Sequence, residues 1–451
     1  MPFPQSFLDE LMARSDIVDV VGSYVQLTRK GANLFGLCPF HSEKTGSFSV
    51  SPDKQIYYCF GCKRGGGVIN FIMEEENLSF PDAVRFLAKR AGMEVPEEDG
   101  DREAGRRRQR LLDLNRDAAR FYYQMLQQPE GRAVQEYLDR RKIRRATAVN
   151  FGLGASLDAW DALILAMTKK GYTKSELLEA GLAVQNRNGG LYDKFRNRLI
   201  FPVIDVRGDV VAFGGRVLDK SEPKYMNSQE TPVYSKRRVL YGLNLAKKSK
   251  RSNIILCEGN IDVVTLHQAG FDNAVASMGT ALTVEQTRLL SRFTKELVLC
   301  YDNDNAGKIA TERALEILNN SEFSVKVLQL PRRRTEDGKL VKQDADDFIK
   351  LQGKDAFEAL LTGSENGIEF RMAQAAGKYD LSSDEARVAY CEEVSALLAA
   401  LANPVEREIY TTRAAETAKI TPEAMRLEVQ RAFKRRLSRE KRQELRRDLN
   451  P

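Results

Sequence analysis

The pattern of apolar and polar residues divides the chain into segments of different period. Apolar residues recur at helical spacing in residues 79–91, which close a cysteine-bearing unit, and again from Leu111 to about Leu138. Between them, residues 94–110 contain almost no large apolar side chain. This composition predicts an exposed linker that separates an N-terminal unit, residues 1–93, from the rest of the chain.

Strand patterns replace the helical period between Asn188 and Val217. Two apolar runs, RLIFPVID and VVAFGGRV, flank the turn sequence Arg207-Gly208-Asp209. Apolar runs joined by a short glycine-containing turn are typical of a β-hairpin. We therefore expect strands in the second half of the segment 111–252.

Short apolar strands alternate with helices in residues 253–350. The strands are IILC, AVAS, ELVLCYD and VKVLQL, and the helices are expected at residues 261–269, 284–293 and 306–318. This alternation predicts a parallel sheet with right-handed crossovers, in which ligands bind at the carboxyl ends of the strands. Residues 351–436 are expected to be helical and to precede a basic tail at 437–451. The fold class is therefore α/β, in several domains.

Composition narrows the setting in which such a chain works. Its 451 residues exceed what one hydrophobic core holds. No apolar run approaches the roughly 20 residues of a membrane helix, and residues 1–5 show none of the regions of a signal peptide. We expect a soluble, cytoplasmic protein with no membrane partner, whose six cysteines are reduced or metal-bound.

Charge adds a modest indication of nucleic-acid binding. The net charge is +7, from 70 basic and 63 acidic residues, which permits a polyanionic partner without requiring one. Basic residues gather in four clusters, at 106–110, 140–145, 247–251 and 433–447. Each cluster alone is typical of a solvated helix face, whereas four together favour a nucleic-acid surface.

Four residues have the spacing of a zinc site. Cys38, His41, Cys59 and Cys62 form the close pairs C-x2-H and C-x2-C, and the span between them predicts a β-hairpin. Four protein ligands close a tetrahedral site and leave no open position, so the expected Zn²⁺ is structural. A disulfide is the alternative for such cysteines, and an intracellular setting argues against it.

The remaining cysteines and the second histidine have no such partners. Cys257 and Cys300 lie in strand-like runs, and with Cys391 they are expected to be small core residues. His267 falls within a predicted helix, where packing or surface exposure is the simplest role. A Ser-His-Asp or Cys-His hydrolase is therefore disfavoured.

Carboxylates follow the strands of the predicted parallel sheet. Glu258 comes directly after IILC, Asp302 and Asp304 follow LVLCY, and Asp344 and Asp346 come after the fourth strand. Parallel strands end at one edge of a sheet, and oxygen ligands gathered there suit Mg²⁺ or Mn²⁺. Two such ions can support phosphoryl transfer. A single acid after a strand is more often a helix cap or a turn residue.

Several motifs resemble one known family. EGNIDVVTLHQAG and CYDNDNAGKIA are similar to the glutamate and DxD motifs of the Toprim fold, and CPFH with CFGC resembles the zinc ribbon of bacterial DNA primases. FLDELMARSDIVDVVGSYV, YDKFRNRLIFPVIDVRGDVVAFGGRVL and PKYMNSQETPVYSKRRVLYGL are similar to the same family. The resemblance covers about residues 1 to 436. It implies a zinc ribbon, a mixed α/β RNA polymerase core containing a Toprim-like parallel sheet, and a C-terminal helical segment.

The resemblance also implies an activity and its residues. The activity is template-directed synthesis of short RNA primers on single-stranded DNA from ribonucleoside triphosphates, with release of pyrophosphate. Glu258, Asp302, Asp304, Asp344 and Asp346 would then handle the catalytic Mg²⁺ or Mn²⁺. Asp262 matches another acidic position, with a helix-stabilising role as the alternative. The residues that match nucleotide-phosphate and template contacts are Lys224, Asn227, Lys236, Arg196 and Arg198.

The chain departs from the family pattern at three places. Asn303 stands where a Gly is usual between the two aspartates of the DxD motif, and Asn tolerates the left-handed backbone that such a turn can need. Ala345 replaces a usual Pro, and residues 332–342 lengthen the loop before it. Family members generally continue into a helical domain that binds the replicative helicase, whereas this sequence stops at Pro451. We therefore expect a helicase partner but no helicase-binding domain, either because the sequence is truncated or because the protein meets its helicase differently.

Two other functions compete with primer synthesis. Toprim-type DNA cleavage by a nuclease or topoisomerase uses similar acids, but none of the 15 tyrosines carries a recognisable signal for a topoisomerase nucleophile. GxxxxGK[ST] occurs nowhere, so a built-in P-loop ATPase is not indicated. A non-enzymatic zinc-ribbon module that binds DNA would leave the acidic residues without a role.

Overall fold

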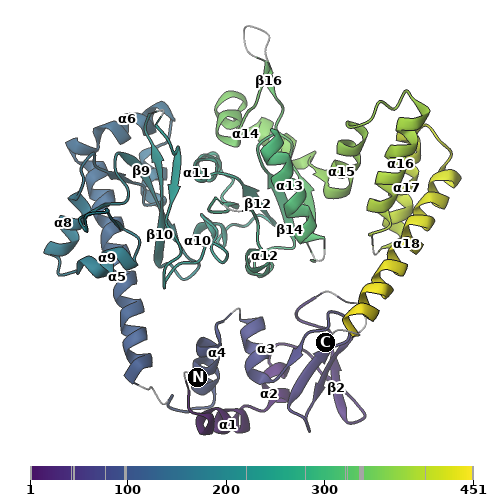
Figure 1. The fold of residues 1–451 in the computed structure, drawn as a ribbon, viewed down its shortest axis with the longest axis horizontal. Helices are drawn as coiled ribbons and strands as arrows, with labels where there is room; N and C mark the ends of the chain where they lie inside the picture. The colour runs from purple at the N-terminus through teal and green to yellow at the C-terminus, as the bar shows by residue number, and fades with distance from the viewer. Residues whose placement is uncertain are drawn as a thin grey trace. The chain divides into compact units, whose positions relative to one another are not determined.

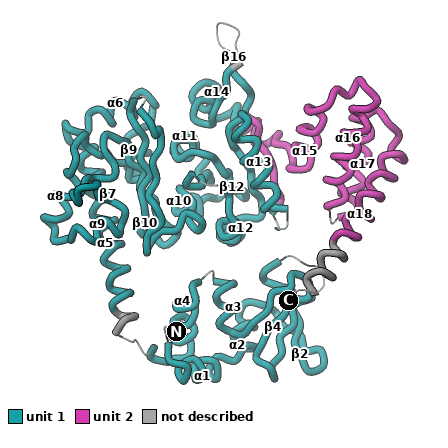
Figure 2. The backbone as a smooth tube through the Cα atoms, viewed as in Figure 1, with its two compact units in different colours: residues 1–323, 330–357 teal, residues 324–329, 358–451 magenta. Residues whose placement is uncertain are grey.

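The computed structural model describes residues 3–41, 43, 46–76, 78–95, 99–219, 221–279, 281–319, 321, 323–334, 340–401 and 403–448. Figure 1 follows the elements along the chain. They form two compact units, residues 1–323 with 330–357, and residues 324–329 with 358–451 (Figure 2).

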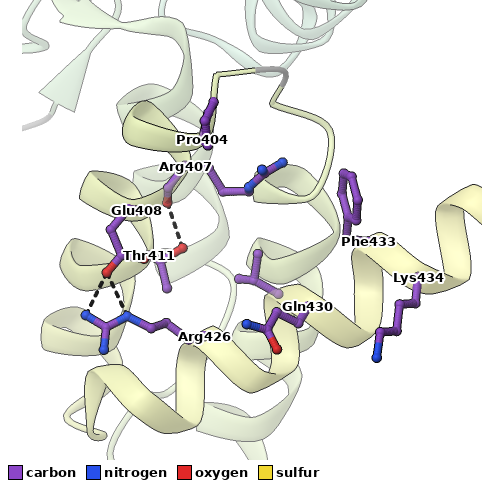
Figure 3. A pocket seen from close by; sticks show the side chains of 9 residues that line it. Pro404, Arg407, Glu408, Thr411, Arg426, Gln430, Phe433 and Lys434 are labelled. Carbon is purple, nitrogen blue, oxygen red and sulfur yellow. Dashed lines mark hydrogen bonds and ion pairs between the residues drawn. The ribbon is translucent and has the colours of Figure 1, made fainter.

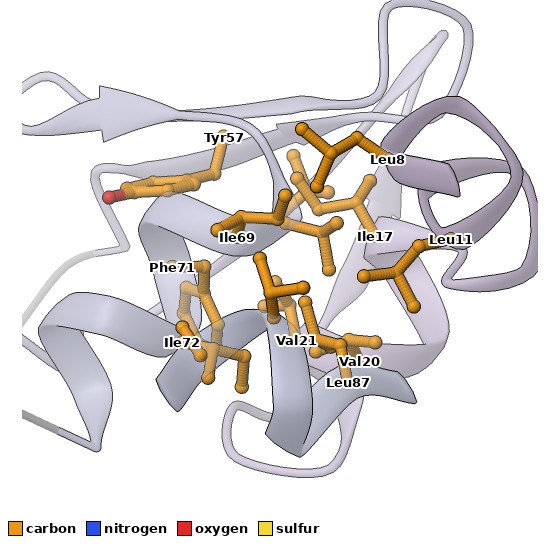
Figure 4. Packing of buried hydrophobic residues seen from close by; sticks show 14 of the residues in the cluster. Leu8, Leu11, Ile17, Val20, Val21, Tyr57, Ile69, Phe71, Ile72 and Leu87 are labelled. Atoms are coloured by element: carbon orange, nitrogen blue, oxygen red, sulfur yellow. The ribbon is translucent and has the colours of Figure 1, made fainter. Parts of the chain in front are cut away.

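The cysteine-bearing segment packs helices on an antiparallel sheet. The strands lie in the order β1 (Thr28–Lys30), β2 (Asn33–Gly36), β3 (Phe48–Ser51), β4 (Ile56–Cys59) and β5 (Gly65–Gly66). The helices are α1 (Gln5–Arg14), α2 (Ile17–Gly22), α3 (Val68–Glu75) and α4 (Phe80–Arg90). Leu11, Ile17, Phe71 and Leu87 converge from these helices into one apolar core (Figure 4). The predicted hairpin is confirmed as β3 and β4, and the predicted helix at 79–91 as α4.

Helix α5 (Asp99–Gln127) corrects the expectation of a linker at 94–110. The side chains of residues 103–110 are exposed as expected, but the backbone is helical, and residues 96–98 lie outside the described part. Arg, Gln, Glu and Ala favour helix even without burial. Arg107 and Arg110 also pair with Glu179 and Glu176 at 2.8 and 2.9 Å, which ties this part of the helix to its neighbours.

A second antiparallel sheet follows α5, in the order β11 (Tyr225–Asn227), β10 (Val210–Val217), β9 (Arg198–Ile204) and β6 (Gly154–Ser156). The predicted hairpin is confirmed as β9 and β10. Around this sheet lie η1 (Pro129–Gly131), α6 (Arg132–Arg140), α7 (Arg145–Asn150), α8 (Ala162–Lys169), α9 (Lys174–Glu179) and the pair β7 (Ala183–Gln185) and β8 (Leu191–Asp193).

The predicted parallel strands are confirmed as β12 (Asn253–Cys257), flanked by β13 (Ala274–Ala276) and β14 (Glu296–Cys300). The helices of this region are α10 (Leu243–Ala246), α11 (Asn260–Ala269), α12 (Val284–Leu290), α13 (Asn305–Leu318) and α14 (Ala345–Thr362). A short antiparallel pair, β16 (Arg333–Arg334) and β17 (Leu340–Val341), occupies the lengthened loop. Cys257 and Cys300 are buried register partners, as expected of core residues.

The second unit is a helical bundle with one small strand pair. It contains β15 (Ser324–Val327), which pairs antiparallel with β18 (Glu365–Asn366), and the helices α15 (Gly367–Ala376), α16 (Asp384–Leu398), α17 (Pro404–Ala418) and α18 (Pro422–Asp448). The helical prediction is confirmed apart from β18, and the expected basic tail continues α18 as far as Asp448. Among the described helices, none combines the length and the apolar character needed to cross a bilayer.

Candidate functional site

The four predicted zinc ligands come together. The ligand atoms of Cys38, His41, Cys59 and Cys62 all lie within 4.8 Å of one another. The sulfurs of Cys38 and Cys62 are 3.8 Å apart, and two thiolates bound to one tetrahedral Zn²⁺ lie about 3.8 Å apart as well. His41 directs Nδ1 at the Cys59 sulfur, 3.6 Å away. The donor set and its spacing fit a closed, structural Zn²⁺ site.

Glu43 supports this site and was missed by the sequence reasoning. Its Oε2 lies 3.3 Å from Nε2 of His41, whereas the other ring nitrogen, Nδ1, is the one directed at the Cys59 sulfur. Its Oε1 accepts hydrogen bonds from the amides of Cys38, at 2.9 Å, and Ser47, at 2.8 Å. A carboxylate behind a ligating histidine fixes the ring and raises its basicity. The only signal in the sequence was an acid two residues after His41.

The loops after β12 and β14 bring Glu258 and Asp302 together. The amide of Asp302 donates to Oε2 of Glu258 at 3.4 Å. Asp304 lies on the same loop, and Lys342 Nζ contacts Asp302 Oδ2 at 3.1 Å and Asp304 Oδ2 at 2.9 Å. The three acids predicted from the strand ends therefore share one site, to which Lys342 adds a cation that the sequence reasoning did not identify.

The DxD loop owes its shape to Asp304, Gly307 and Asn303. Asp304 caps α13 and accepts from the amide of Gly307 at 2.8 Å. A Cβ at position 307 would overlap the carbonyl oxygen of Asp302, so only glycine allows this close approach. Asn303 is not among the residues with left-handed backbone. Its side chain instead donates to the Leu330 carbonyl at 3.1 Å, so the expected reason for Asn at this position is wrong.

Asp346 is enclosed by cations rather than open to the site. Its side chain is fully buried and accepts from Arg141, Lys350 and Thr265, each at 2.6 Å. Its own amide donates to Asp262, which also lies buried in the first turn of α11. These contacts occupy both oxygens of Asp346.

Asp344 directly precedes α14 and caps it, because its Oδ1 accepts from the amide of Asp347 at 2.7 Å. Burial raises its pKa, and the negative charges of Asp347, Asp346 and Asp302 raise it further. Burial likewise raises the pKa of Glu258, with Asp302 adding to the effect. Burial and Asp344 raise the pKa of Asp262 well above its usual value. Anions crowded in this way favour a divalent cation among them, and all-oxygen donors suit Mg²⁺.

The predicted phosphate contacts lie directly before β11 (Lys224), on it (Asn227) and in the segment after it (Lys236). Asn227, on β11, donates to the Met278 carbonyl at 3.2 Å, which ties that strand to the loop after β13. The side chain of Lys224 is exposed. The backbone of Lys236 is held by Gln286 of α12, whose Nε2 donates to its carbonyl at 2.9 Å. Lys236 also lies near Lys194, whose pKa is lowered by burial and by that charge.

Arg196 and Arg198 differ in what they contact. Arg196 lies over the rings of Trp160 and Tyr192, at 4.4 and 4.9 Å from their centroids. Trp160 is the only tryptophan of the chain and is 67% exposed. Arg198 is buried, and its guanidinium donates to the Pro223 carbonyl at 3.0 Å. Of the two predicted template residues, Arg196 therefore belongs to an exposed aromatic group, whereas Arg198 holds a turn.

The helical unit carries a groove of about 330 Å³ between α17 and α18 (Figure 3). Arg426 crosses it to an ion pair with Glu408 at 2.6 Å, and Arg407 lies 4.9 Å from the centre of the Phe433 ring. The groove thus combines an aromatic side chain with charged ones.

Models of known families match four stretches of the chain. In chain order they are a CHC2 zinc finger at residues 3–103, the N-terminal domain of the DNA primase catalytic core at 121–247, a Toprim-like domain at 255–349, and a DnaB-helicase binding domain of primase at 368–423. The last match shows that the expectation of no helicase-binding domain was wrong. The residues that carry it lie on α15, α16 and α17, where the sequence pattern indicated only helices.

Whole-chain relatives agree with these matches. The DNA primase of Clostridium acetobutylicum is 41% identical over 425 residues, which cover 93% of this chain and 69% of that protein. The DNA primase of Halalkalibacterium halodurans is 38% identical, with 96% and 72% covered. Among solved structures, the zinc-binding and RNA polymerase domains of the Aquifex aeolicus primase align with a TM-score of 0.58, at 31% identity, over 93% of this chain and 98% of that one. A DnaG primase catalytic domain bound to ssDNA aligns with a TM-score of 0.60, at 32% identity, over 69% and 99%.

Proposed function

The chain belongs to the bacterial DNA primases, and from that membership we propose which of its own residues carry the reaction. A DNA primase is a DNA-directed RNA polymerase that makes RNA primers on single-stranded DNA. The N-terminal zinc ribbon of this chain holds a structural Zn²⁺, and the acidic residues of its Toprim domain suit Mg²⁺.

We propose that Glu258, Asp302, Asp304 and Asp344 hold the Mg²⁺ ions. The bound ions would lower the pKa of the attacking 3′-hydroxyl and neutralise charge on the leaving pyrophosphate. The single observation that carries this proposal is the contact between the amide of Asp302 and Glu258 Oε2, which joins the ends of two neighbouring parallel strands. Asp346, an expected ligand, would have to give up three hydrogen bonds to bind an ion. We therefore assign Asp346 and Asp262 a supporting role.

We propose that Lys224, Lys236 and Asn227 bind the triphosphate and that Arg196 contacts the template strand. Ammonium groups and side-chain amides are suitable donors for phosphate oxygens. An arginine stacked on an exposed tryptophan ring offers an unpaired strand both charge and a stacking surface. Arg198, being buried, would act by holding the turn beside Arg196.

We propose the following division of work among the segments of the chain. Residues 1–93 would contact the template, 111–252 and 253–350 would form the polymerase core, and 351–436 would contact a replicative helicase in the cytoplasm. The match at 368–423 supports the helicase partner. The groove between α17 and α18 extends beyond this match, and its aromatic and charged lining suits a protein surface.

Primer synthesis by purified protein tests the metal site. With ribonucleoside triphosphates, Mg²⁺ and single-stranded DNA, the wild-type chain should make short RNA. Glu258→Gln should abolish the product, whereas Glu316→Gln, on an exposed position of α13, should leave it unchanged. Full activity of Glu258→Gln would refute the assignment. Nicking of supercoiled plasmid by the wild-type protein would favour the nuclease alternative.

A further inference from the structure

Lys342 lies in the place where the proposed metal site needs positive charge. Its ammonium group contacts both Asp302 Oδ2 and Asp304 Oδ2, at 3.1 and 2.9 Å. One ammonium group therefore engages the two carboxylates of the DxD motif that would hold a divalent cation. Lys342 belongs to the lengthened loop, residues 332–342, which has no role in the reaction as proposed so far.

The backbone on both sides of Lys342 is anchored. At the start of the loop, the Leu330 carbonyl accepts from the side chain of Asn303, which lies between the two aspartates. Within the loop, β16 pairs with β17, and Lys342 directly follows β17. On its other side, Gln343 is buried and Asp344 caps α14. The anchored backbone before and after Lys342 therefore positions its ammonium group beside Asp302 and Asp304.

We propose that Lys342 is a tethered competitor of the divalent cation, which must displace it from Asp302 and Asp304 before the site is loaded. This inference rests on the metal site proposed above. An intramolecular ion pair lowers the apparent affinity of any ligand that needs the same carboxylates. The lengthened loop thereby raises the metal concentration at which the enzyme becomes active.

The size of the effect follows from the exposure of the pair. The Lys342 side chain is more than half exposed, so each ion pair is screened by water. Exposed ion pairs contribute little free energy each, so loss of both should tighten metal binding by only roughly three- to tenfold. The side chain can leave without unfolding the chain, because the anchoring contacts are made by its neighbours.

Direct binding of Mn²⁺, measured by the loss of the free-ion electron paramagnetic resonance signal, tests the proposal in the full chain. Lys342→Gln should bind Mn²⁺ roughly three- to tenfold more tightly than the wild type. Lys308→Gln, which removes a positive charge from the first turn of α13 but keeps the Lys342 ion pairs, should bind within about twofold of the wild type. Lys342→Arg, which keeps the charge, should bind no more tightly than the wild type.

Unchanged or weaker binding by Lys342→Gln would overturn the inference, and so would an equal gain in Lys308→Gln. Asp302→Asn separates this failure from failure of the metal site itself. If Asp302→Asn weakens Mn²⁺ binding while Lys342→Gln changes nothing, only the competition is refuted. If Asp302→Asn also binds like the wild type, both the site and the inference fail.

Discussion

Arg141 donates a hydrogen bond to Asp346 across 2.6 Å, although 205 residues separate them in the sequence. The contact joins the segment after α6 to the start of α14, and Lys350 donates to the same oxygen, Oδ2 of Asp346. Removing one partner of such a buried ion pair lowers the free energy of unfolding, because the remaining charge stays buried without its counter-charge. Asp346 therefore stabilises the wall of the site, while Asp344, two residues earlier, faces the other acids.

The two aspartates should respond differently to loss of charge. Asp346→Asn leaves Arg141 and Lys350 without a buried anion, so it should lower the free energy of unfolding by about 3 kcal/mol, with or without Mg²⁺. Asp344→Asn keeps a residue that caps helices well and should change stability little without metal. It should instead reduce the rise in Tm that Mg²⁺ produces. Thermal unfolding at several Mg²⁺ concentrations distinguishes the two, and the reverse pattern would make Asp346 the ligand.

Glu43 should control how firmly the zinc ribbon holds its ion. Glu43→Gln removes the negative charge behind His41, and loss of such a partner weakens zinc binding by about 10- to 100-fold. Competition with a coloured chelator measures the change. Glu10→Gln, in the exposed Arg14 pair of α1, is the matched control and should release zinc like the wild type. Equal zinc retention by Glu43→Gln would show that the carboxylate does not support the site.

Gly307 should tolerate no side chain. Gly307→Ala places a methyl group on the Asp302 carbonyl, which must then move together with the DxD loop. We expect primer synthesis to fall at least tenfold, since small displacements of positioned groups are costly. Gly105→Ala, on an open part of α5, adds a better helix former and should keep full activity. An active Gly307→Ala enzyme would show that the loop is adaptable.

Asp193 should make the stability of the polymerase core depend on pH. Burial raises the pKa of Asp193 to about 6, although hydrogen bonds from the amides of Leu163 and Ile164 oppose this rise. The unfolded value is near 3.9. Between these values the native state binds more protons than the unfolded state, so the free energy of unfolding falls as pH rises through this window.

The fluorescence of Trp160, whose carbonyl accepts from the amide of Asp193, reports unfolding of this region in urea. On moving from pH 7.5 to pH 5, the free energy of unfolding of the wild type should rise relative to that of Asp193→Asn. Asp158→Asn, an exposed neighbour, should follow the wild type at both pH values. A difference between wild type and Asp193→Asn that stays constant with pH would contradict the assigned pKa.

Helices and strands could be predicted from the sequence where the local period of apolar residues is clear. The zinc ligands could be predicted because they are closely spaced along the chain. The zinc residues and the acids at strand ends come together because a knuckle and a parallel sheet impose that geometry. The roles of Asn303, Lys342 and Arg141 could not be predicted, because their partners are set by tertiary contacts and not by sequence neighbours. The helix at 99–110 was missed because low hydrophobicity was taken as a sign of a linker, whereas propensity and ion pairs to Glu176 and Glu179 hold it.

The position of bound metal decides whether Glu258 and Asp302 form the catalytic site. A crystal of the protein soaked with Mn²⁺ and a ribonucleoside triphosphate, with data collected at the manganese absorption edge, would locate the ions by anomalous scattering. We expect density within bonding distance of Glu258 and Asp302, with Lys342 withdrawn from the aspartates. Well-ordered Mn²⁺ and triphosphate at another place, with these carboxylates free of metal, would show that Glu258 and Asp302 do not hold the catalytic ions.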